Sequence, residues 1–386
     1  MRLRTSVTFG LALMLAAALY GRPAARTAAA AAAPTAAPAV EAMGVVPGAV
    51  PGAAFESIGT MAFAPDGVLF AADTQAAAIY VLDLGAAASS GTPGAKDVPA
   101  IDQKIAALLG TDAASITVGD MAVHPKTHHV YFSVTRAQGA GAAPALVRLD
   151  GAGTLAVVPF DSVKSAKATL PNAPVATPGE RRNPRAQSIT DMAFVGGKLY
   201  VAGLSNEEFA SKLRAVPYPF SSVEAGTSVE IYHGSHGAIE TRSPVYAFVP
   251  YDVAGTPHII AGYLCTPLVK FPVSSLMQGG KVRGTTIAEL GAGNRPIDMI
   301  VYTQGGQDYL LMSNTNRGVM KIPTANFATA AGIEALVQGK AGIDYETIAS
   351  LKGIEQLDRL DERRAIVLAR EAGAGSALNL QAVPLP

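Results

Sequence analysis

The chain has 386 residues, of which 49% are hydrophobic and only 16% charged, and its formal net charge is +0. The balanced charge, without a long basic run, argues against a nucleic-acid partner, and the single cysteine excludes an intrachain disulfide. The 39 glycines and 26 prolines are typical of a turn-rich β protein, and one all-β domain can be this large.

The first residues predict an exported protein. Arg2 and Arg4 precede an apolar run of about 14 residues, Val7–Tyr20, which is typical of a secretory signal peptide and short for a membrane span. We assign residues 1–26 to this signal peptide and the Ala/Pro-rich residues 27–43 to a disordered linker. An uncleaved N-terminal anchor is the alternative. The expected location is periplasmic or secreted, with no membrane span after cleavage.

From residue 44 onward one unit recurs six times. Its clearest copy is Arg295–Phe327, in which three short apolar runs are joined by turn residues, the pattern of a β-meander. A second copy, Pro244–Leu276, aligns with it without gaps from Ile259 and Leu310 onward. The looser copies are Thr60–Leu84, Asp120–Asp150, Asp191–Phe220 and Ile354–Leu385.

The repeat length predicts the fold. Equivalent positions lie 53 to 71 residues apart, at Met61, Met121, Met192, Tyr246, Met299 and Gln356. This period, slightly above that of common propeller blades, predicts an all-β protein: a six-bladed β-propeller of four-stranded antiparallel blades, forming one domain over residues 44–386. One such sheet cannot bury both of its faces alone, whereas packing against two neighbours around an axis buries them.

The gaps between the repeats should hold the remaining elements. Fourth strands are expected there, for example at Ser228–Tyr232 and Val282–Leu290. Short helical inserts between blades are expected at Ile101–Gly110, Ala331–Lys340 and Tyr345–Leu351. Because the last repeat ends after three strands, we expect Gly44–Phe55 to pair with it and close the ring. An edge strand tolerates the two prolines of this segment.

Two kinds of loop should share one face of the propeller, namely the loops that enter the innermost strands and the loops between second and third strands. The first kind places Asp120, Asp191 and Asp298 at the starts of innermost strands, with Arg185 and Arg295 just before two of them. The second kind adds Asn206, Cys265, Asn314, Asn316 and Arg317. We predict that these residues form a ligand-binding face.

The three aspartates have two possible roles. Acids and amides that converge on a channel mouth could hold a cation such as Ca²⁺, which prefers oxygen ligands. Alternatively, the aspartates accept hydrogen bonds from backbone amides of neighbouring blades and hold the ring together. The sequence favours this second role, because residues repeated at one place in each repeat usually serve the repeat itself.

The histidines form two groups. His233 and His236, with Glu240 four residues later, combine imidazoles and a carboxylate in a way that suits zinc or copper, or else they face solvent in a Gly-rich turn. The second group is expected at the opposite face and comprises His124, His128 and His129. Cys265 is interpreted as a ligand, a reactive thiol or a buried small apolar residue.

Two segments carry a resemblance to known families. ADTQAAAIYVLDL and SNTNRGVMKIP resemble the strand–turn–strand of NHL and YVTN-type propeller repeats. The number of blades and the export signal resemble six-bladed gluconolactonase-like and soluble quinoprotein glucose dehydrogenase-like folds, and Val229–Phe327 resembles a type found in uncharacterised secreted bacterial propeller proteins. The resemblance implies an architecture. Neither the metal-binding set of the first enzymes nor the His/Arg set of the second can be placed on this sequence.

Two functions therefore follow as hypotheses. The first is a monomeric, non-catalytic periplasmic or secreted scaffold that binds a protein or a small molecule on its loop face. The alternative is a metal- or quinone-dependent hydrolase or oxidoreductase with its site at the channel mouth. The sequence contains no GxSxG, Walker, CxxCH or helix-opening GxGxxG motif that would decide between them.

Overall fold

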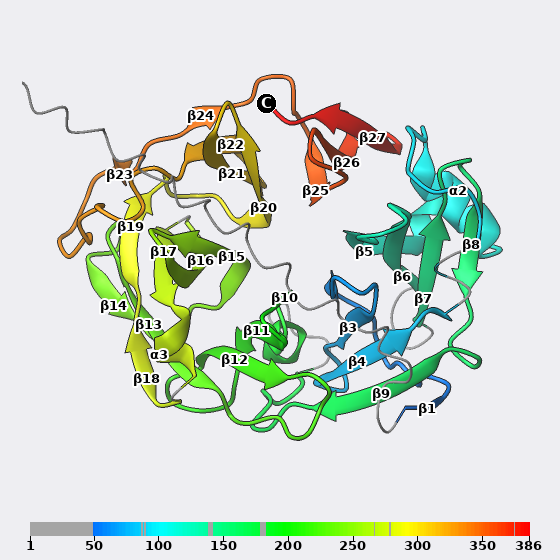
Figure 1. Ribbon diagram of the computed structural model, residues 1–386, viewed down its shortest axis with the longest axis horizontal. Helices are drawn as coiled ribbons and strands as arrows, with labels where there is room; N and C mark the ends of the chain where they lie inside the picture. The colour runs from blue at the N-terminus through cyan, green and yellow to red at the C-terminus, as the bar shows by residue number, and fades with distance from the viewer. Residues whose placement is uncertain are drawn as a thin grey trace, which may run out of the picture. The chain divides into compact units, whose positions relative to one another are not determined.

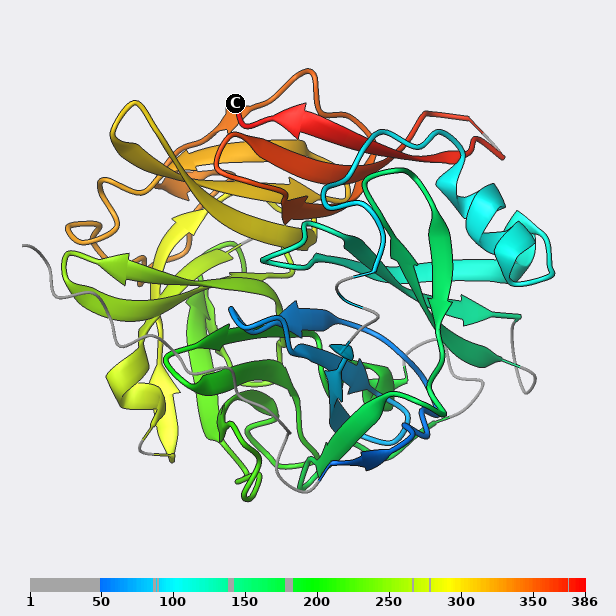
Figure 2. The ribbon, with the colours of Figure 1, turned by 45° about the vertical axis from the view of Figure 1, so that its right-hand side comes forward.

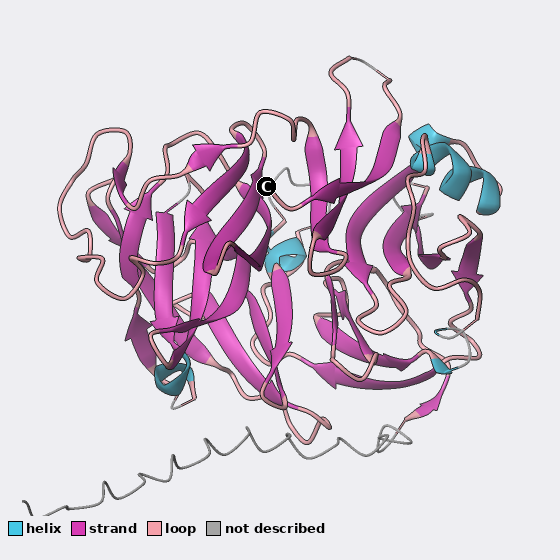
Figure 3. Ribbon diagram, turned by 45° about the horizontal axis from the view of Figure 1, so that its top comes forward, coloured by secondary structure: helices cyan, strands magenta, loops and turns pink. Residues whose placement is uncertain are grey.

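The computed structural model describes residues 49–85, 88, 90–137, 142–177, 183–265, 267–277, 279–373 and 375–386. All of them belong to one compact unit, Ala42–Pro386. The expected signal peptide, the linker and Gly44–Gly48 lie outside the described residues. The described part is a six-bladed β-propeller, as the sequence predicted (Figure 1). Strands make up most of the described structure, and helices are few and short (Figure 3).

We number the blades by their order along the chain. The first blade contains β2 (Met61–Phe63), β3 (Leu69–Asp73), β4 (Ala78–Asp83), β9 (Lys164–Thr169) and, outermost, β1 (Val50–Pro51). The second contains β5 (Ile116–Val123), β6 (Val130–Arg136), β7 (Ala143–Leu149) and β8 (Leu155–Val158). The third contains β10 (Asp191–Val195), β11 (Lys198–Leu204), β12 (Ser211–Pro217), β13 (Thr227–His233) and β14 (Ala238–Glu240), with β18 (Lys281–Arg283) parallel to β13.

The remaining blades follow the same plan. The fourth contains β15 (Val245–Val253), β16 (Thr256–Tyr263), β17 (Pro267–Pro272), β19 (Thr285–Glu289) and β23 (Ala341–Gly342). The fifth contains β20 (Pro296–Gln304), β21 (Gln307–Asn314), β22 (Gly318–Pro323) and β24 (Glu346–Thr347). The sixth contains β25 (Ile354–Arg359), β26 (Arg364–Arg370) and β27 (Leu378–Pro384). The blades are thus mostly antiparallel and differ in strand number, rather than having four strands throughout.

The second strand of a blade is an almost continuous apolar run. All five residues of β3 are buried, and so are six of the seven in β11. A strand has a continuous apolar sequence when neighbouring layers cover both of its faces, whereas a half-exposed strand alternates apolar and polar residues. The hydrophobic core is accordingly divided into clusters that lie between blades.

The blades do not follow one another around the ring in chain order. The innermost strands are neighbours in the order β5, β2, β10, β15, β20, β25 and back to β5, so the second blade lies between the first and the sixth (Figure 1). The hydrophobic clusters agree, because one joins the second and sixth blades and another joins the first and third. The first two blades have therefore exchanged places.

The segment after β4 makes this exchange possible by crossing the second blade. The carbonyl of Thr92 accepts a hydrogen bond from the amide of Gly151, 2.7 Å away, and Gly94 donates to the carbonyl of Thr127, also at 2.7 Å. A Cβ added to Gly151 would lie 2.3 Å from the carbonyl oxygen of Pro93, so only glycine permits this close approach. The segment then reaches the sixth blade, where Val98 pairs with Leu380 of β27.

The prediction that Gly44–Phe55 closes the ring on the last blade is wrong. Its described part contains β1, which pairs with β9 and extends the first blade instead. The two residues of β1 are exposed and precede the first blade directly, so the outer edge of that blade is the edge they reach. β9 itself comes after the second blade in the chain and supplies an outer strand of the first.

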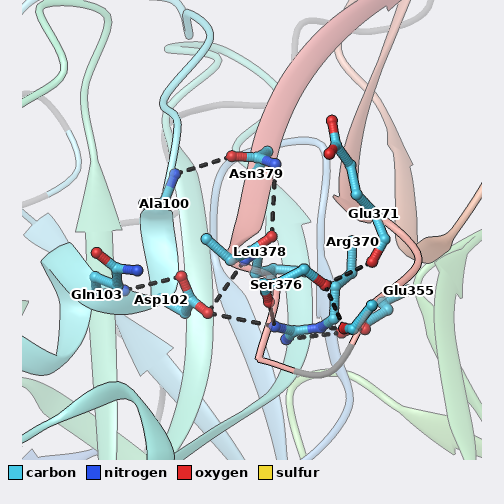
Figure 4. Close-up of polar contacts among 11 residues, drawn as sticks. Ala100, Asp102, Gln103, Glu355, Arg370, Glu371, Ser376, Leu378 and Asn379 are labelled. Carbon is cyan, nitrogen blue, oxygen red and sulfur yellow. Dashed lines mark hydrogen bonds and ion pairs between the residues drawn. The ribbon is translucent and has the colours of Figure 1, made fainter.

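The sixth blade is completed by the region around helix α2 (Ile101–Leu108), which confirms the helix expected at Ile101–Gly110 (Figure 2). Asp102 of α2 accepts hydrogen bonds from the amide of Leu378, at 3.1 Å, and from the guanidinium of Arg370, at 3.4 Å (Figure 4). The amide of Ala100 donates to the side chain of Asn379, at 3.0 Å. Side-chain and backbone contacts thus replace a full fourth strand at this edge.

Two further expected helices are not formed. Ala331–Lys340 is irregular, and Tyr345–Leu351 contains β24, the outer strand of the fifth blade. The expected strand at Ser228–Tyr232 is confirmed as β13, whereas Val282–Leu290 is divided between β18 and β19. Other short helices include a 3₁₀ turn at Ala113–Ser115, another at Pro184–Gln187, and α3 (Val273–Leu276). No helix among the described residues is long and apolar enough to span a membrane.

Ring closure through α2 rather than β1 predicts different losses of stability for two substitutions. Ile101 is fully buried between the second and sixth blades, so Ile101→Ala should lower the free energy of unfolding by about 2–5 kcal/mol. Val50 of β1 is 62% exposed, so Val50→Ala should change it by less than about 0.5 kcal/mol. Urea unfolding measures both values, and a larger loss in Val50→Ala would contradict this assignment.

Candidate functional site

A β-bulge or a similar irregularity recurs in the first half of four innermost strands. The extra residue is Gly119 in β5, Tyr246 in β15 and Glu355 in β25, and β20 has a similar irregularity at Ile297 and Asp298. A bulge inserts a residue that has no partner across the ladder, and it turns the local side chains in a new direction. Here all of these residues lie around one depression, so the bulges aim side chains at the mouth of the channel.

The predicted aspartates join neighbouring blades. Asp120 accepts a hydrogen bond from the amide of Met61 at 2.6 Å, Asp191 from Phe248 at 2.6 Å, and Asp298 from Leu357 at 2.7 Å. Each of these amides belongs to the next blade around the ring. The aspartates therefore hold neighbouring blades together, which is the role that the sequence favoured.

A fourth acid of the same kind was not predicted from the sequence. Asp358 of β25 accepts a hydrogen bond from the amide of Val123, at 2.7 Å, and so joins the sixth blade to the second. It falls two residues after the position of Gln356 in the repeat, which hid it from the alignment. Its link to the second blade is a direct consequence of the exchanged blade order.

Burial shifts the acids of the channel toward their neutral form. Desolvation in the channel wall is the largest cause and raises the pKa of Asp120 to about 8, against the opposing hydrogen bonds from Met61 and Met121. Desolvation likewise raises the pKa of Asp191 to about 7 and that of Asp358 to about 6. The pKa of Asp298 is raised well above its usual value by desolvation and by the nearby charge of Asp120.

The mouth of the channel is a depression of about 1090 Å³. Six of the ten predicted face residues line it: Asp120, Asp191, Asp298, Arg295, Asn314 and Asn316. Below it the channel continues as a second cavity of about 310 Å³, which the same aspartates and Asp358 also line. The three acids therefore converge on one channel, although only Asp191 begins its strand, whereas β5 already starts at Ile116 and β20 at Pro296.

The other four predicted residues do not line this depression. They are Arg185, Asn206, Cys265 and Arg317. The guanidinium of Arg317 donates to the carbonyl of Ala292 at 3.0 Å. The backbone amide of Asn206 donates to the carbonyl of Asn172 at 2.8 Å. Among the described residues no ion pair joins Arg185 or Arg295 to the three aspartates, so backbone amides rather than arginines stabilise those acids.

Several lining residues were not predicted. Gln187 donates from Nε2 to the hydroxyl of Tyr246 at 2.9 Å, and the guanidinium of Arg295 lies 5.4 Å from the centre of the Tyr246 ring. Gln356 donates to the carbonyl of Gly119 at 3.2 Å, while its buried Oε1 has no hydrogen-bond partner among the described residues. The bulges explain Tyr246, but a bulge leaves no signal in a single sequence.

The predicted histidine group is assembled at the end of β13. Glu240 Oε1 accepts from His233 Nδ1 at 2.9 Å and from His236 Nδ1 at 2.6 Å. The hydrogen bond from His233 is the largest cause that lowers the pKa of Glu240 to about 2. Cys265, predicted separately, belongs to this group, because one donor atom each from His233, His236 and Cys265 lie within 4.8 Å of one another.

The second histidine group lies in the turn between β5 and β6, at the end of β5 that is farther from Asp120. His124 is buried against Phe63, with ring centres 5.1 Å apart, and desolvation lowers its pKa to about 4. His129 Nε2 lies 3.0 Å from the carbonyl oxygen of Thr92 in the crossing segment. These histidines are packing and hydrogen-bonding residues of the second blade, separate from His233 and His236.

The fold described above rests on the structure itself, and comparison with known proteins adds only weak similarities. No protein-family model and no curated protein matches the chain. A putative oxidoreductase (glucose dehydrogenase) from Thermus thermophilus is 15% identical with a TM-score of 0.36, covering 87% of this chain and 98% of that one. The PQQ-bound aldose sugar dehydrogenase of Streptomyces coelicolor is 13% identical with a TM-score of 0.30, covering 87% and 96%.

A third similar structure is the β-propeller domain of Cps50 (Swd1) from Myceliophthora thermophila. It is 12% identical with a TM-score of 0.33, covering 85% of this chain and 84% of that one. Identities and TM-scores this low carry no argument about activity, and a propeller fold hosts many functions. The function therefore has to be argued from the depression itself.

The raised pKa values predict a pH dependence of stability. A carboxyl group whose pKa is higher in the folded than in the unfolded chain binds protons preferentially in the folded state, so stability falls as pH rises between the two values. For Asp120 and Asp191 the unfolded value is 3.8 and the folded values are about 8 and about 7. We expect the free energy of unfolding to fall from about pH 4 to about pH 8 and then to level off. Urea unfolding across this range measures the effect.

The matched variant is Asp120→Asn, because its amide oxygen can still accept the hydrogen bond from Met61 but carries no charge. This variant should flatten the pH dependence. A wild-type stability that stays constant or rises over the same interval would contradict the assignment of these acids as desolvated and partly neutral.

Proposed function

We propose that this protein is a binding propeller that holds a small, polyhydroxylated molecule in the depression at the mouth of its channel. The observation that carries the proposal is the depression itself, a polar concavity of about 1090 Å³ at the point where the innermost strands begin. Small-molecule sites are concave and of roughly this size, on the order of 300–1,000 Å³, whereas protein-docking faces are flatter.

The chemistry of the lining supports a ligand rich in hydroxyl groups. The walls combine the carboxyl of Asp191, the carboxamide of Gln187, the phenol of Tyr246 and the guanidinium of Arg295. A hydroxyl group both donates and accepts hydrogen bonds, so it can pair with every one of these groups. A ligand with a single strong charge would be attracted by one of the charged side chains, Asp191 or Arg295, and repelled by the other.

Two lining residues, Arg295 and Gln356, have polar groups without a partner among the described residues. Arg295 is exposed, and among the described residues its guanidinium makes no ion pair. Gln356 Oε1 is buried and lacks a partner in the described part of the chain, which leaves an acceptor to be satisfied. By contrast, Arg370 is held by Glu355 and by the carbonyl of Ser376, at 2.7 and 2.6 Å.

One observation favours an enzyme as the second candidate. Asp120 and Asp191 line the depression, and desolvation raises their pKa values to about 8 and about 7. A carboxyl group that changes protonation near neutral pH suits general acid–base chemistry. Asp120→Asn separates the candidates, since a binding protein should keep its ligand affinity and an enzyme should bind but lose turnover.

The binding proposal predicts a loss of affinity in Arg295→Gln. Saturation-transfer NMR with a panel of pentoses, hexoses and disaccharides identifies a ligand, and titration calorimetry measures its Kd. Removal of the charged donor should weaken binding by about tenfold. Arg283→Gln is the control, because Arg283 pairs with Glu230 at the outer edge of the third blade and does not line the depression. Absence of any saccharide signal, or equal losses in both variants, would contradict the proposal.

We also propose that the protein acts outside the cytoplasm as a monomer, and the proposal of export rests on Arg2, Arg4 and the apolar run Val7–Tyr20. N-terminal sequencing of protein from a cell envelope or culture fraction should give a chain that begins between Gly21 and Ala30. Intact Met1–Arg4 at the N-terminus would contradict cleavage, and recovery from cytosol alone would contradict export.

A further inference from the structure

Two blades bring two imidazoles and the only thiol of the chain together. His233 ends β13 and His236 follows in the turn to β14, whereas Cys265 lies in the turn between β16 and β17 of the neighbouring blade. One donor atom of each residue lies within 4.8 Å of the donors of the other two. Among the described residues, this is the group of histidine, cysteine and acidic side chains arranged to hold a metal ion.

Glu240 fixes the orientation of both imidazoles. Its Oε1 accepts from His233 Nδ1 and from His236 Nδ1, so both rings carry their proton on Nδ1 and turn Nε2 away from the carboxylate. The two ring centres lie 3.8 Å apart at an interplanar angle of 37°, which places the rings side by side. A carboxylate that accepts the second N–H of a histidine is the usual support of a metal-ligating imidazole.

The Nε2 atom of His233 points to a missing ligand. His233 is only 1% exposed, and its Nε2 has no hydrogen-bond partner among the described residues. The nearest acid oxygen, Glu289 Oε2, is 3.9 Å away, and Glu289 is already engaged by the amide of Gly234 and the hydroxyl of Ser235. A buried nitrogen without a partner is costly, and a metal ion bound at its lone pair would remove that cost.

We propose that His233, His236 and Cys265 form a Zn²⁺ site, with Glu240 as the carboxylate that orients the two imidazoles. Two imidazole nitrogens and a thiolate are ligands that Zn²⁺ prefers, and a fourth position remains for water. Ligand atoms of a tetrahedral zinc site lie about 3.3–3.8 Å apart, so the group must contract by about 1 Å. The side chain of His236 is 51% exposed and can make this movement, while His233 stays in place.

The site is distinct from the depression at the channel mouth, which none of its three ligands lines. It joins the third and fourth blades at their loops, whereas their packed cores already lie against each other elsewhere. Bound zinc would therefore add a cross-link between two blades and would be independent of any molecule in the channel mouth. The two proposals can fail separately.

The test is a titration of untagged full-length protein with Zn²⁺ in competition with a chromogenic chelator. We expect about one equivalent to bind, and Co²⁺ to give the thiolate charge-transfer band in its place. Cys265→Ser should abolish that band and weaken zinc binding by more than about tenfold, and Glu240→Gln should weaken it by about 10–100-fold. Zinc should also raise the Tm of the wild type but not that of Cys265→Ser.

The matched control is His128→Asn. His128 has a left-handed backbone with φ of 57°, which asparagine adopts readily, and it lies outside the group. This variant should bind zinc as the wild type does. Failure of the wild type to take up stoichiometric zinc, or equal zinc affinity in wild type, Cys265→Ser and His236→Ala, would overturn the proposal.

Discussion

Hydrogen bonds from a backbone amide of one blade to a channel-lining aspartate of the next are the interaction on which this propeller depends. Asp120 makes such a bond between the second and first blades, and Asp191 between the third and fourth. Asp298 makes one between the fifth and sixth blades, and Asp358 between the sixth and second. Each bond satisfies an amide that a sheet cannot pair internally, because the innermost strand has no further strand beside it. As a result the channel is polar, and carboxyl groups line the bottom of the depression at its mouth.

How much of this could be predicted follows from what a sequence pattern encodes. Apolar periodicity identifies the repeated strands, so the number of blades and the approximate positions of Asp120, Asp191 and Asp298 followed from the repeats, whereas the number of strands in each blade did not. The pattern says that a face is buried but not which neighbour buries it. The exchange of the first two blades depends on contacts such as Val98 with Leu380, and these contacts have no local signature.

The candidate sites divide in the same way. The acids of the innermost strands could be located, because their position in the repeat fixes their place within a blade. Tyr246 and Glu355 could not, since a bulge shifts the register by one residue without changing the composition of the strand. Cys265 lies in the kind of loop expected for it, but its contact with His233 depends on how two blades meet side by side.

During synthesis, the segment around Ala100 emerges from the ribosome long before the residues it packs against. Its partner Asn379 is 279 residues further along, so the ribosome adds it much later. Contacts between such distant residues form late, because the whole intervening chain must first be ordered. β4 also has to wait for β9, which emerges only after the complete second blade. A nascent chain halted before β27 would therefore leave Ile101 and Ile105 of α2 without their contacts to Leu378 and Leu380. Removal of β27 would destabilise α2, although more than 250 residues separate the two in the chain.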